Sequence, residues 1–278
     1  LMMDDNSGQP SAKEVFDTTP YTILVVDDNP DMTDFLKRTF EGYFKRIIIA
    51  GDGVEALQLV RSHVPDIIVS DVMMPRMNGY ELCKTIKEDI AISHIPVILL
   101  TAKDDKQSLI SGYKNGADGY LSKPFEVEML MELIRNRLKN REYTKKRYLN
   151  AGLIPTPEES TISLTDETFL IKLNSIIQEN IENSNLGIQF ICQEVGLGRS
   201  SLYNKLKALT GMGANEYISK LRIEKAITLI SGTDMPFSEI AEKTGFTTPS
   251  YFSTAFKQYT GETPSQYKER KKKGLADK

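Results

Sequence analysis

The first 140 residues alternate between short apolar runs and amphipathic stretches. The apolar runs have the length and composition of buried strands, and they are predicted at Tyr21–Val26, Arg46–Ala50, Asp66–Ser70, Pro96–Leu100 and Gly119–Ser122. Between them, helical spacing of apolar residues predicts helices from Pro30, from Asp52, from Asn78-Gly79, around Ser108–Asn115 and from Glu126 to about Asn140. This strict alternation predicts an α/β fold with a doubly wound, five-stranded parallel sheet.

From Asp166 onward the pattern is helical throughout and contains an internal repeat. Leu202, Leu206 and Gly211 match Phe252, Phe256 and Gly261 at a constant offset of 50 residues. Each copy predicts a short helix, a turn and a second helix, at Ile188–Val195 and Arg199–Leu209, then at Phe237–Thr244 and Thr248–Tyr259. One amphipathic helix, around Phe169–Ile181, precedes the repeat, and a long helix at Ala214–Ile230 joins the copies. The pattern predicts an all-α domain with two helix-turn-helix units.

Polar stretches that contain Pro and Gly separate these regions. They predict an N-terminal linker at 1–19, an α/β domain at 20–140, a second linker at 141–162, an all-α domain at 163–270 and a basic tail at 271–278. The start of the second linker also allows an extension of the helix before it.

Charge and composition add modest constraints. The formal net charge is −3, with +2 from Thr161 onward and −5 in the rest, which permits nucleic-acid binding by the second half without demonstrating it. Cys83 and Cys192 lie far apart in apolar helical patterns, which favours reduced core thiols over a disulfide or metal pair. No apolar run approaches the ~20 residues of a membrane helix, and no signal peptide is recognisable. We therefore expect a cytoplasmic protein without membrane contact.

Polar groups follow four of the predicted strands. Asp27 and Asp28 come after the first strand, Asp71 after the third, Thr101 after the fourth and Lys123 after the fifth. The carboxyl ends of parallel strands meet at one edge, where open α/β sheets place their chemistry. Clustered carboxylates repel unless a cation joins them, and carboxylate oxygens with room for water suit Mg²⁺.

This cluster suits the chemistry of phosphoryl transfer. A lysine and a hydroxyl beside the carboxylates would bind a tetrahedral anion. The arrangement predicts that Asp71 accepts a phosphoryl group as an acyl phosphate, with Mg²⁺ and Lys123 offsetting the charge. No glycine-rich loop of the Walker type precedes a helix, so ATP is not expected to be the direct donor.

Residues 21–140 resemble the receiver domain of two-component response regulators. The matching segments are Val25-Val26-Asp27-Asp28, Asp71-Val72-Met73-Met74-Pro75-Arg76-Met77-Asn78-Gly79, Leu100-Thr101-Ala102 and Lys123-Pro124-Phe125. The resemblance implies a flavodoxin-like fold with Asp71 as the phosphoacceptor. It also implies that Asp27, Asp28, Asp71 and the backbone carbonyl of Met73 hold Mg²⁺, that Thr101 is the switch hydroxyl, and that Tyr120 is the switch aromatic.

Residues 163–270 resemble the AraC-type DNA-binding domain. The strongest matches are Ile240-Ala241, Gly245-Phe246, Ser250-Tyr251-Phe252, Phe256-Lys257, Thr260-Gly261 and Pro264-Ser265-Gln266-Tyr267. The first unit departs slightly, with Gly198 where Ser usually caps the recognition helix. A rigid helix between two such units would let them enter successive major grooves on one face of DNA.

Helical spacing separates expected core residues from expected DNA contacts. Leu202, Leu206, Leu209, Phe252 and Phe256 are expected to point inward. The outward positions are Arg199, Ser200, Tyr203, Asn204 and Lys207 on the first recognition helix, and Pro249, Ser250, Ser253, Thr254 and Lys257 on the second. Base contacts are expected from Ser200, Tyr203, Asn204, Ser250, Ser253 and Thr254, and phosphate contacts from Arg199, Lys205, Lys207 and Lys257. The alternative for each position is a solvated helix face.

These features predict a phosphorylation-gated, sequence-specific transcription regulator. Its expected partners are a histidine kinase, double-stranded DNA and a second copy of the chain, bound through the face of the fourth helix, fifth strand and fifth helix after phosphorylation. No enzymatic activity is expected beyond its own phosphorylation and dephosphorylation. The polar lead-in and the domain order resemble the C-terminal end of hybrid regulators, in which a histidine kinase precedes the receiver, and a stand-alone regulator is the alternative.

Two other classes of function stay open. A phosphotransferase or phosphatase with an Asp nucleophile would form the same aspartyl phosphate, but it typically needs a second acid to protonate the leaving group. Met73, two residues after Asp71, cannot supply that proton. A receiver with a helical protein-docking module is the third class, and salt-dependent binding to a specific duplex would exclude it.

Overall fold

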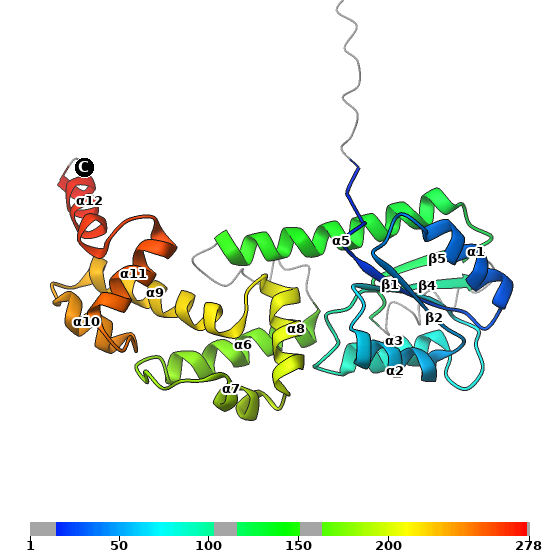
Figure 1. Ribbon diagram of the computed structural model, residues 1–278, viewed down its shortest axis with the longest axis horizontal. Helices are drawn as coiled ribbons and strands as arrows, with labels where there is room; N and C mark the ends of the chain where they lie inside the picture. The colour runs from blue at the N-terminus through cyan, green and yellow to red at the C-terminus, as the bar shows by residue number, and fades with distance from the viewer. Residues whose placement is uncertain (1–14, 103–115, 151–162, 277–278) are drawn as a thin grey trace, which may run out of the picture.

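The structure is a computed structural model that describes residues 15–102, 116–150 and 163–276. An α/β domain and an all-helical domain lie at opposite ends of the molecule, and the long helix α5 (Val127–Asn150) reaches from the first towards the second (Figure 1). None of the helices in the described ranges is long and apolar enough to cross a membrane.

In its described residues, the α/β domain contains five parallel strands. They are β1 (Thr22–Val26), β2 (Arg46–Ala50), β3 (Ile67–Asp71), β4 (Val97–Ala102) and β5 (Gly119–Lys123). The strand order is β2-β1-β3-β4-β5, and every adjacent pair is parallel. This order confirms the predicted doubly wound sheet of the flavodoxin type. All five residues of β3 are buried, as its nearly continuous apolar sequence requires.

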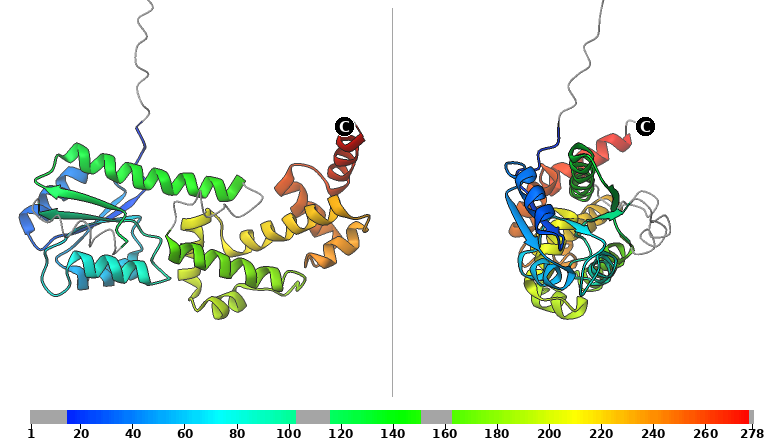
Figure 2. Two further views of the ribbon diagram at one scale, coloured as in Figure 1. Left: turned by 180° about the vertical axis from the view of Figure 1, so that it is seen from behind. Right: turned by 90° about the vertical axis from the view of Figure 1, so that its right-hand side faces the viewer.

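Helices cover both faces of this sheet (Figures 1 and 2). On one face, Leu24, Val26, Ile68 and Leu99 pack against α2 (Gly53–His63) and α3 (Gly79–Glu88). On the other, Ile23, Val25, Ile67 and Val69 pack against α1 (Pro30–Phe40) and α5. Successive strand residues therefore point to opposite layers, as the pleat dictates. The helix predicted around Ser108–Asn115 lies outside the described residues.

Over residues 163–276, which the structure describes, the second domain contains helices and no strands. They are α6 (Leu164–Glu179), α7 (Ile188–Val195), α8 (Arg199–Thr210), α9 (Ala214–Gly232), α10 (Phe237–Lys243), α11 (Pro249–Thr260) and α12 (Pro264–Ala276). The pairs α7–α8 and α10–α11 confirm the two helix-turn-helix units, and α9 joins them. Each unit has its own apolar core, one built around α6 to α9 and the other around α9 to α12.

Two segments that were predicted as linker or tail are helical in the structure. Helix α5 was expected to end at about Asn140, with an extension into the start of the linker left open. The extension is confirmed, because α5 continues to Asn150 and the first half of the predicted linker is helical. The reason is tertiary packing, because Tyr148 is buried in the core of the first helix-turn-helix unit and its carbonyl accepts a hydrogen bond from Lys220. Helix α12 was not predicted. It begins at Pro264 and runs through most of the predicted basic tail, with the Arg270 guanidinium 5.0 Å from the Tyr267 ring.

The two domains share a buried contact. Ile90 and Ala91, which follow α3, pack against the core of the first helix-turn-helix unit. His94 lies in the same contact, only 8 % exposed, and neither ring nitrogen has a hydrogen-bond partner. The pKa of His94 is held well below its usual value, mainly by burial and then by the positive charges of Arg141, Lys205 and Lys87. The charge of Asp166 acts in the opposite direction but does not outweigh them.

The turn glycine of the second helix-turn-helix unit, Gly245, packs closely against the backbone at Ile181 in the same helical domain. Gly245 has φ +72°, and a Cβ there would lie 2.2 Å from the carbonyl oxygen of Ile181. We expect Gly245→Ala to lower the free energy of unfolding by roughly 2–5 kcal/mol, from left-handed strain and steric overlap together. Urea unfolding followed by circular dichroism measures the loss.

The turn glycine of the first unit is the matched control. Gly196 has φ +73°, but nothing lies within 4 Å of a Cβ there. Gly196→Ala should therefore cost only about 1–2 kcal/mol, from the backbone conformation. Equal losses at the two positions would show that contact with Ile181 does not constrain Gly245.

The buried His94 predicts that stability falls in mild acid. An unfolded chain binds a proton at histidine near pH 6.5, whereas the folded chain resists that proton because the pKa of His94 is lowered. As the pH falls below about 6.5, the free energy of unfolding should drop by up to about 1.4 kcal/mol per pH unit from this residue. His94→Phe should remove this part of the pH dependence, as urea unfolding between pH 7.5 and 5.5 would measure. His63→Phe, at the surface, is the matched control, and the same pH dependence in both variants would contradict the assignment.

Candidate functional site

The carboxyl edge of the sheet gathers the polar groups that follow the strands. Asp71 is the last residue of β3, and Asp27 directly follows β1. Thr101 lies in β4, one residue before its end, and Lys123 is the last residue of β5. Because the strands are parallel and in register, their ends converge, and Asp27 and Asp71 are both buried.

Lys123 joins the two buried carboxylates. Its Nζ lies 2.6 Å from Oδ1 of Asp71 and 2.8 Å from Oδ2 of Asp27. Burial lowers the pKa of the ammonium group, but hydrogen bonds to the two carboxylates and their charges outweigh burial and raise the pKa above its usual value. Lys123 therefore stays protonated at neutral pH and offsets one of two negative charges, which leaves one for a further cation to balance.

The backbone holds Asp71 from two sides. The Met73 N–H donates to Oδ2 of Asp71 at 2.9 Å. The Gly79 N–H donates to the Val72 carbonyl at 3.0 Å, and a Cβ on Gly79 would lie 2.2 Å from the carbonyl oxygen of Asp71. Glycine is therefore required where α3 begins, because its backbone packs directly against the end of β3.

The oxygen atoms at this edge suit Mg²⁺. In the described part of the chain, no three His, Cys, Asp or Glu side chains cluster as a metal site. Mg²⁺, however, usually binds one or two carboxylates and completes its shell with water and phosphate oxygens. Asp27 and Asp71 fit this requirement. The exposed Asp28 and the carbonyl of Met73 are the other predicted ligands.

The two predicted switch residues lie on β4 and β5. Thr101 is buried, and its hydroxyl donates a long hydrogen bond of 3.5 Å to the Ala102 carbonyl. It follows Leu100, which is the register partner of Asp71. Tyr120 is half-buried on β5 and packs against the apolar layer that includes α2 and α3.

Most predicted DNA contacts on α8 lie at the surface. Arg199, Ser200, Tyr203 and Lys207 are exposed, and Asn204 is half-buried. Gly198 precedes the helix at the N-cap position and supplies no side-chain cap, as the sequence predicts. This exposed face combines two positive charges with hydroxyl and amide groups.

The corresponding face of α11 has a different character. Pro249, Ser250, Thr254 and Lys257 are exposed, and Ser253 is half-buried. The hydroxyls of Ser253 and Thr254 donate to the carbonyls of Pro249 and Ser250 in their own helix, at 3.0 and 3.1 Å. These hydroxyls therefore present an oxygen acceptor outward, and Thr254 also presents its methyl group.

The expected phosphate contact at Lys205 is wrong. Its side chain is fully buried and forms an ion pair with Asp166 of α6. The ammonium also lies 5.0 Å from the centre of the Phe169 ring. A lysine is usually exposed unless it is paired, and the local sequence gave no sign of a partner so far away.

Tyr251 was missed as a surface residue of α11. It is 55 % exposed, and its ring lies edge-on to Phe246 at 5.8 Å. Tyr203 on α8 has the same exposure. The position directly before the inward-pointing Phe252 could have indicated this exposure, because adjacent helical residues lie about 100° apart.

Comparison with known proteins identifies both domains. A family model for the response regulator receiver domain matches residues 23–135, and one for a helix-turn-helix domain matches residues 191–270. Histidine kinase P4 of Formosa agariphila is 41% identical over 90% of this chain, but the chain spans only 18% of that relative. Response regulator MprA of Mycobacterium sp. (strain KMS) is 36% identical over 55% of this chain and 70% of its own length.

Among solved structures, the receiver domain of the Francisella response regulator 1452 is 37% identical. It covers 43% of this chain and 98% of its own, with a TM-score of 0.40. The family-model matches agree with the structure along most of the chain. The receiver match falls on the parallel sheet, and the helix-turn-helix match falls on the helical domain. The chain belongs to the response regulator family, with a receiver domain followed by an AraC-type helix-turn-helix domain.

Proposed function

We propose that the chain is a phosphorylation-gated DNA-binding transcription regulator and that Asp71 accepts the phosphoryl group. The observation that carries this proposal is the Asp27–Lys123–Asp71 cluster at the carboxyl edge of the sheet. We assign phosphoryl acceptance to residues 20–140 and DNA binding to residues 163–270. The phosphoryl donor is a phosphohistidine on a histidine kinase.

The transfer step follows from the groups around Asp71. A carboxylate oxygen of Asp71 forms a bond to phosphorus while the bond between phosphorus and the donor imidazole breaks, and the imidazole leaves with the bonding electron pair. Lys123 neutralises charge on the phosphoryl oxygens. Asp27, Asp28, Asp71 and the carbonyl of Met73 would hold Mg²⁺, which supplies further positive charge when it is bound. The N–H of Met73 orients the carboxylate before the transfer.

The response to phosphorylation is assigned to Thr101 and Tyr120. Among the residues that the structure describes, the Thr101 hydroxyl makes one long hydrogen bond, to the Ala102 carbonyl. Breaking this bond would cost little if the hydroxyl turned towards a phosphoryl group at the neighbouring strand end. Movement of Thr101 would free space along β5 for Tyr120. Repacking of this face would favour a homodimer and pair two DNA-binding domains.

The helix-turn-helix units would bind double-stranded DNA through α8 and α11. Arg199, Lys207 and Lys257 are the candidates for phosphate contacts, whereas Ser200, Tyr203 and Asn204 on α8 are candidates for base contacts. On α11, Pro249, Ser250, Ser253 and Thr254 would position the protein and make methyl or water-mediated contacts, which their internally bonded hydroxyls support.

The kinase is proposed to lie on the same longer chain. The similarity to histidine kinase P4 over most of this chain, which spans 18% of that relative, supports such a hybrid arrangement. A kinase on a separate chain is the alternative. Phosphoryl transfer to Asp71 from a purified, separately encoded kinase of the same genome would favour this alternative.

Activation of Asp71 should strengthen binding to operator DNA. We expect beryllofluoride with Mg²⁺, which mimics the phosphoryl group, to increase the affinity of the wild type by about tenfold. Asp71→Ala should show no increase, because it lacks the carboxylate that binds the mimic. Fluorescence anisotropy on a duplex selected from a genomic fragment library measures both affinities.

Asp34→Ala, at an exposed acid of α1, is the control and should respond like the wild type. Equal binding with and without the mimic would remove the gating proposal but keep DNA binding. Light scattering on the same samples tests the dimer, and an unchanged monomer mass after activation would remove that part.

The two recognition helices should differ in their contribution to specificity. Asn204→Ala should reduce discrimination between operator and mutated duplexes by about 1–3 kcal/mol, because an amide can bond a base edge with two groups. Thr254→Ala should reduce this discrimination between duplexes by a smaller amount. Titrations against duplexes with single base-pair changes test this order, and a larger loss for Thr254→Ala would reverse it.

A further inference from the structure

A buried polar cluster joins the receiver domain to the first recognition helix. Ser93 lies between α3 and β4, Asp166 lies in the first turn of α6, and Lys205 lies in the middle of α8. The Ser93 hydroxyl donates to Oδ1 of Asp166 at 2.7 Å, and Nζ of Lys205 donates to Oγ of Ser93 at 2.8 Å and also bonds Asp166. All three side chains are buried. We call this cluster the junction.

The receiver domain supplies one member of the junction and the helical domain supplies two. Burial raises the pKa of Asp166, but the charge and the hydrogen bond of Lys205 outweigh burial. The pKa of Asp166 is therefore held below its usual value. A buried ion pair requires hydrogen bonds to the remaining polar groups, and Ser93 provides both a donor and an acceptor. Because its bonds cross from one domain to the other, the junction favours this arrangement of the two domains.

Neighbouring contacts support the same arrangement. The Thr165 hydroxyl donates to the Lys87 carbonyl at 3.1 Å. A Cβ on Gly211, at the end of α8, would lie 3.3 Å from the Leu149 side chain of α5. Ile90 and Ala91 add apolar contact. The contacts thus come from α5, from the end of α3 and from the segment between α3 and β4.

The receiver contacts α8 on the side opposite its exposed face. Lys205 lies two residues from both Tyr203 and Lys207, which corresponds to about 200° around the helix. Tyr203 and Lys207 are exposed while Lys205 is fully buried. The receiver therefore contacts the face of α8 that carries Lys205 and leaves the proposed DNA-binding side chains at the surface.

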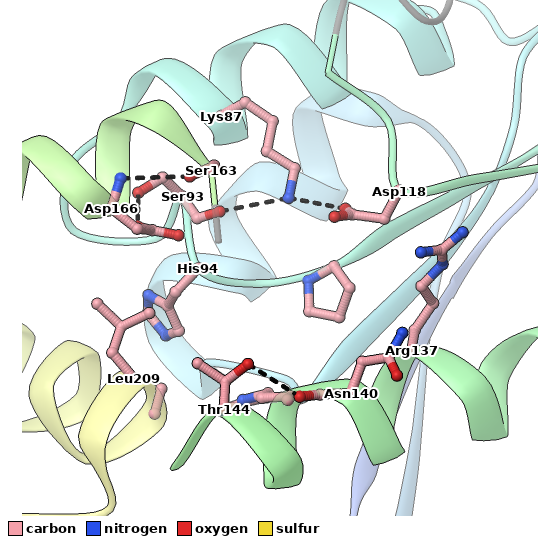
Figure 3. Close-up of a pocket in the computed structure, with 13 residues that line it drawn as sticks. Lys87, Ser93, His94, Asp118, Arg137, Asn140, Thr144, Ser163, Asp166 and Leu209 are labelled. Carbon is pink, nitrogen blue, oxygen red and sulfur yellow. Dashed lines mark hydrogen bonds and ion pairs between the residues drawn. The ribbon is translucent and has the colours of Figure 1, made fainter. Parts of the chain in front are cut away.

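A pocket beside the junction leaves space for repacking. It has a volume of about 140 Å³ and is lined by His94, Asp118, Arg137, Asp166 and Leu209, among others (Figure 3). Figure 3 shows α5 along one side and the residues around Ser93 and His94 along the other. Closely packed interiors move between discrete arrangements, and this pocket gives the side chains that line it room to repack.

Two elements connect this junction with the phosphoryl-accepting edge. Strand β4 carries Thr101 near its carboxyl end and begins shortly after Ser93 and His94. Helix α5 begins soon after Lys123, passes the pocket at Arg137, and carries Tyr148 into the helical core near its end. A shift at the carboxyl end of β4 or at the start of α5 would reach α8 through rigid secondary structure.

We propose that Ser93, Asp166 and Lys205 position the first recognition helix relative to the receiver, so that the state of Asp71 reaches DNA binding through this junction. Lys205 is thus a positioning residue and not a DNA contact. The inference rests on the proposed function and names the contact through which its regulation operates.

The test is the ratio of DNA affinities with and without beryllofluoride and Mg²⁺ in the full chain. We expect about tenfold for the wild type and less than about threefold for Ser93→Ala, which removes only the receiver hydroxyl. The double variant Asp166→Leu/Lys205→Met replaces the ion pair by apolar side chains and should bring the ratio close to one. Circular dichroism establishes that each variant is folded.

Two control variants separate coupling from ordinary loss of binding. Ser62→Ala removes an exposed hydroxyl elsewhere in the receiver and should keep the wild-type ratio. Lys207→Met on α8 should weaken binding in both states but preserve the ratio. If Ser93→Ala and the double variant both keep the full wild-type ratio, the receiver communicates with α8 through other contacts. This result would overturn the junction inference but leave the proposed gating in place. Absence of a response in the wild type overturns the proposed gating, and the junction inference with it.

Discussion

Two buried carboxylates that share one ammonium group determine the chemistry of the receiver domain. Asp27 and Asp71 both contact Lys123, and like charges so close together repel unless positive charge joins them. The parallel sheet makes this possible, because it brings the carboxyl ends of β1, β3 and β5 to one edge. One negative charge is left over, and a buried site with unbalanced charge responds strongly when a cation or a phosphoryl group arrives.

Much of this edge could be predicted from the sequence, because strand direction and strand ends are local properties. Apolar runs locate the strands, and parallel pairing converts their ends into neighbours in space. The repeat in the second half was equally visible. Gly211 and Gly261 end α8 and α11 with φ of +75° and +82°, a conformation in which glycine is strongly favoured, so a 50-residue offset in sequence marked a repeated structure.

The contacts between the domains could not be predicted in this way. Lys205 is 39 residues from Asp166 and 112 from Ser93, and helical spacing alone assigns a lysine to the surface. The extension of α5, which the sequence left open, depends on a contact of the same kind. Its residues after Asn140 are mostly polar and resemble a linker, and only the burial of Tyr148 in another domain explains why the helix continues.

The polar character of the domain contact matters for regulation. Apolar contacts such as those of Ile90 are non-directional and would tolerate several arrangements of the two domains. A buried ion pair that needs the hydroxyl of Ser93 tolerates far fewer, yet such pairs add little net stability, because their desolvation offsets their attraction. A contact of this kind defines an orientation without binding the domains irreversibly. Small changes transmitted by β4 or α5 can therefore shift the balance between two arrangements, which a large apolar interface would resist.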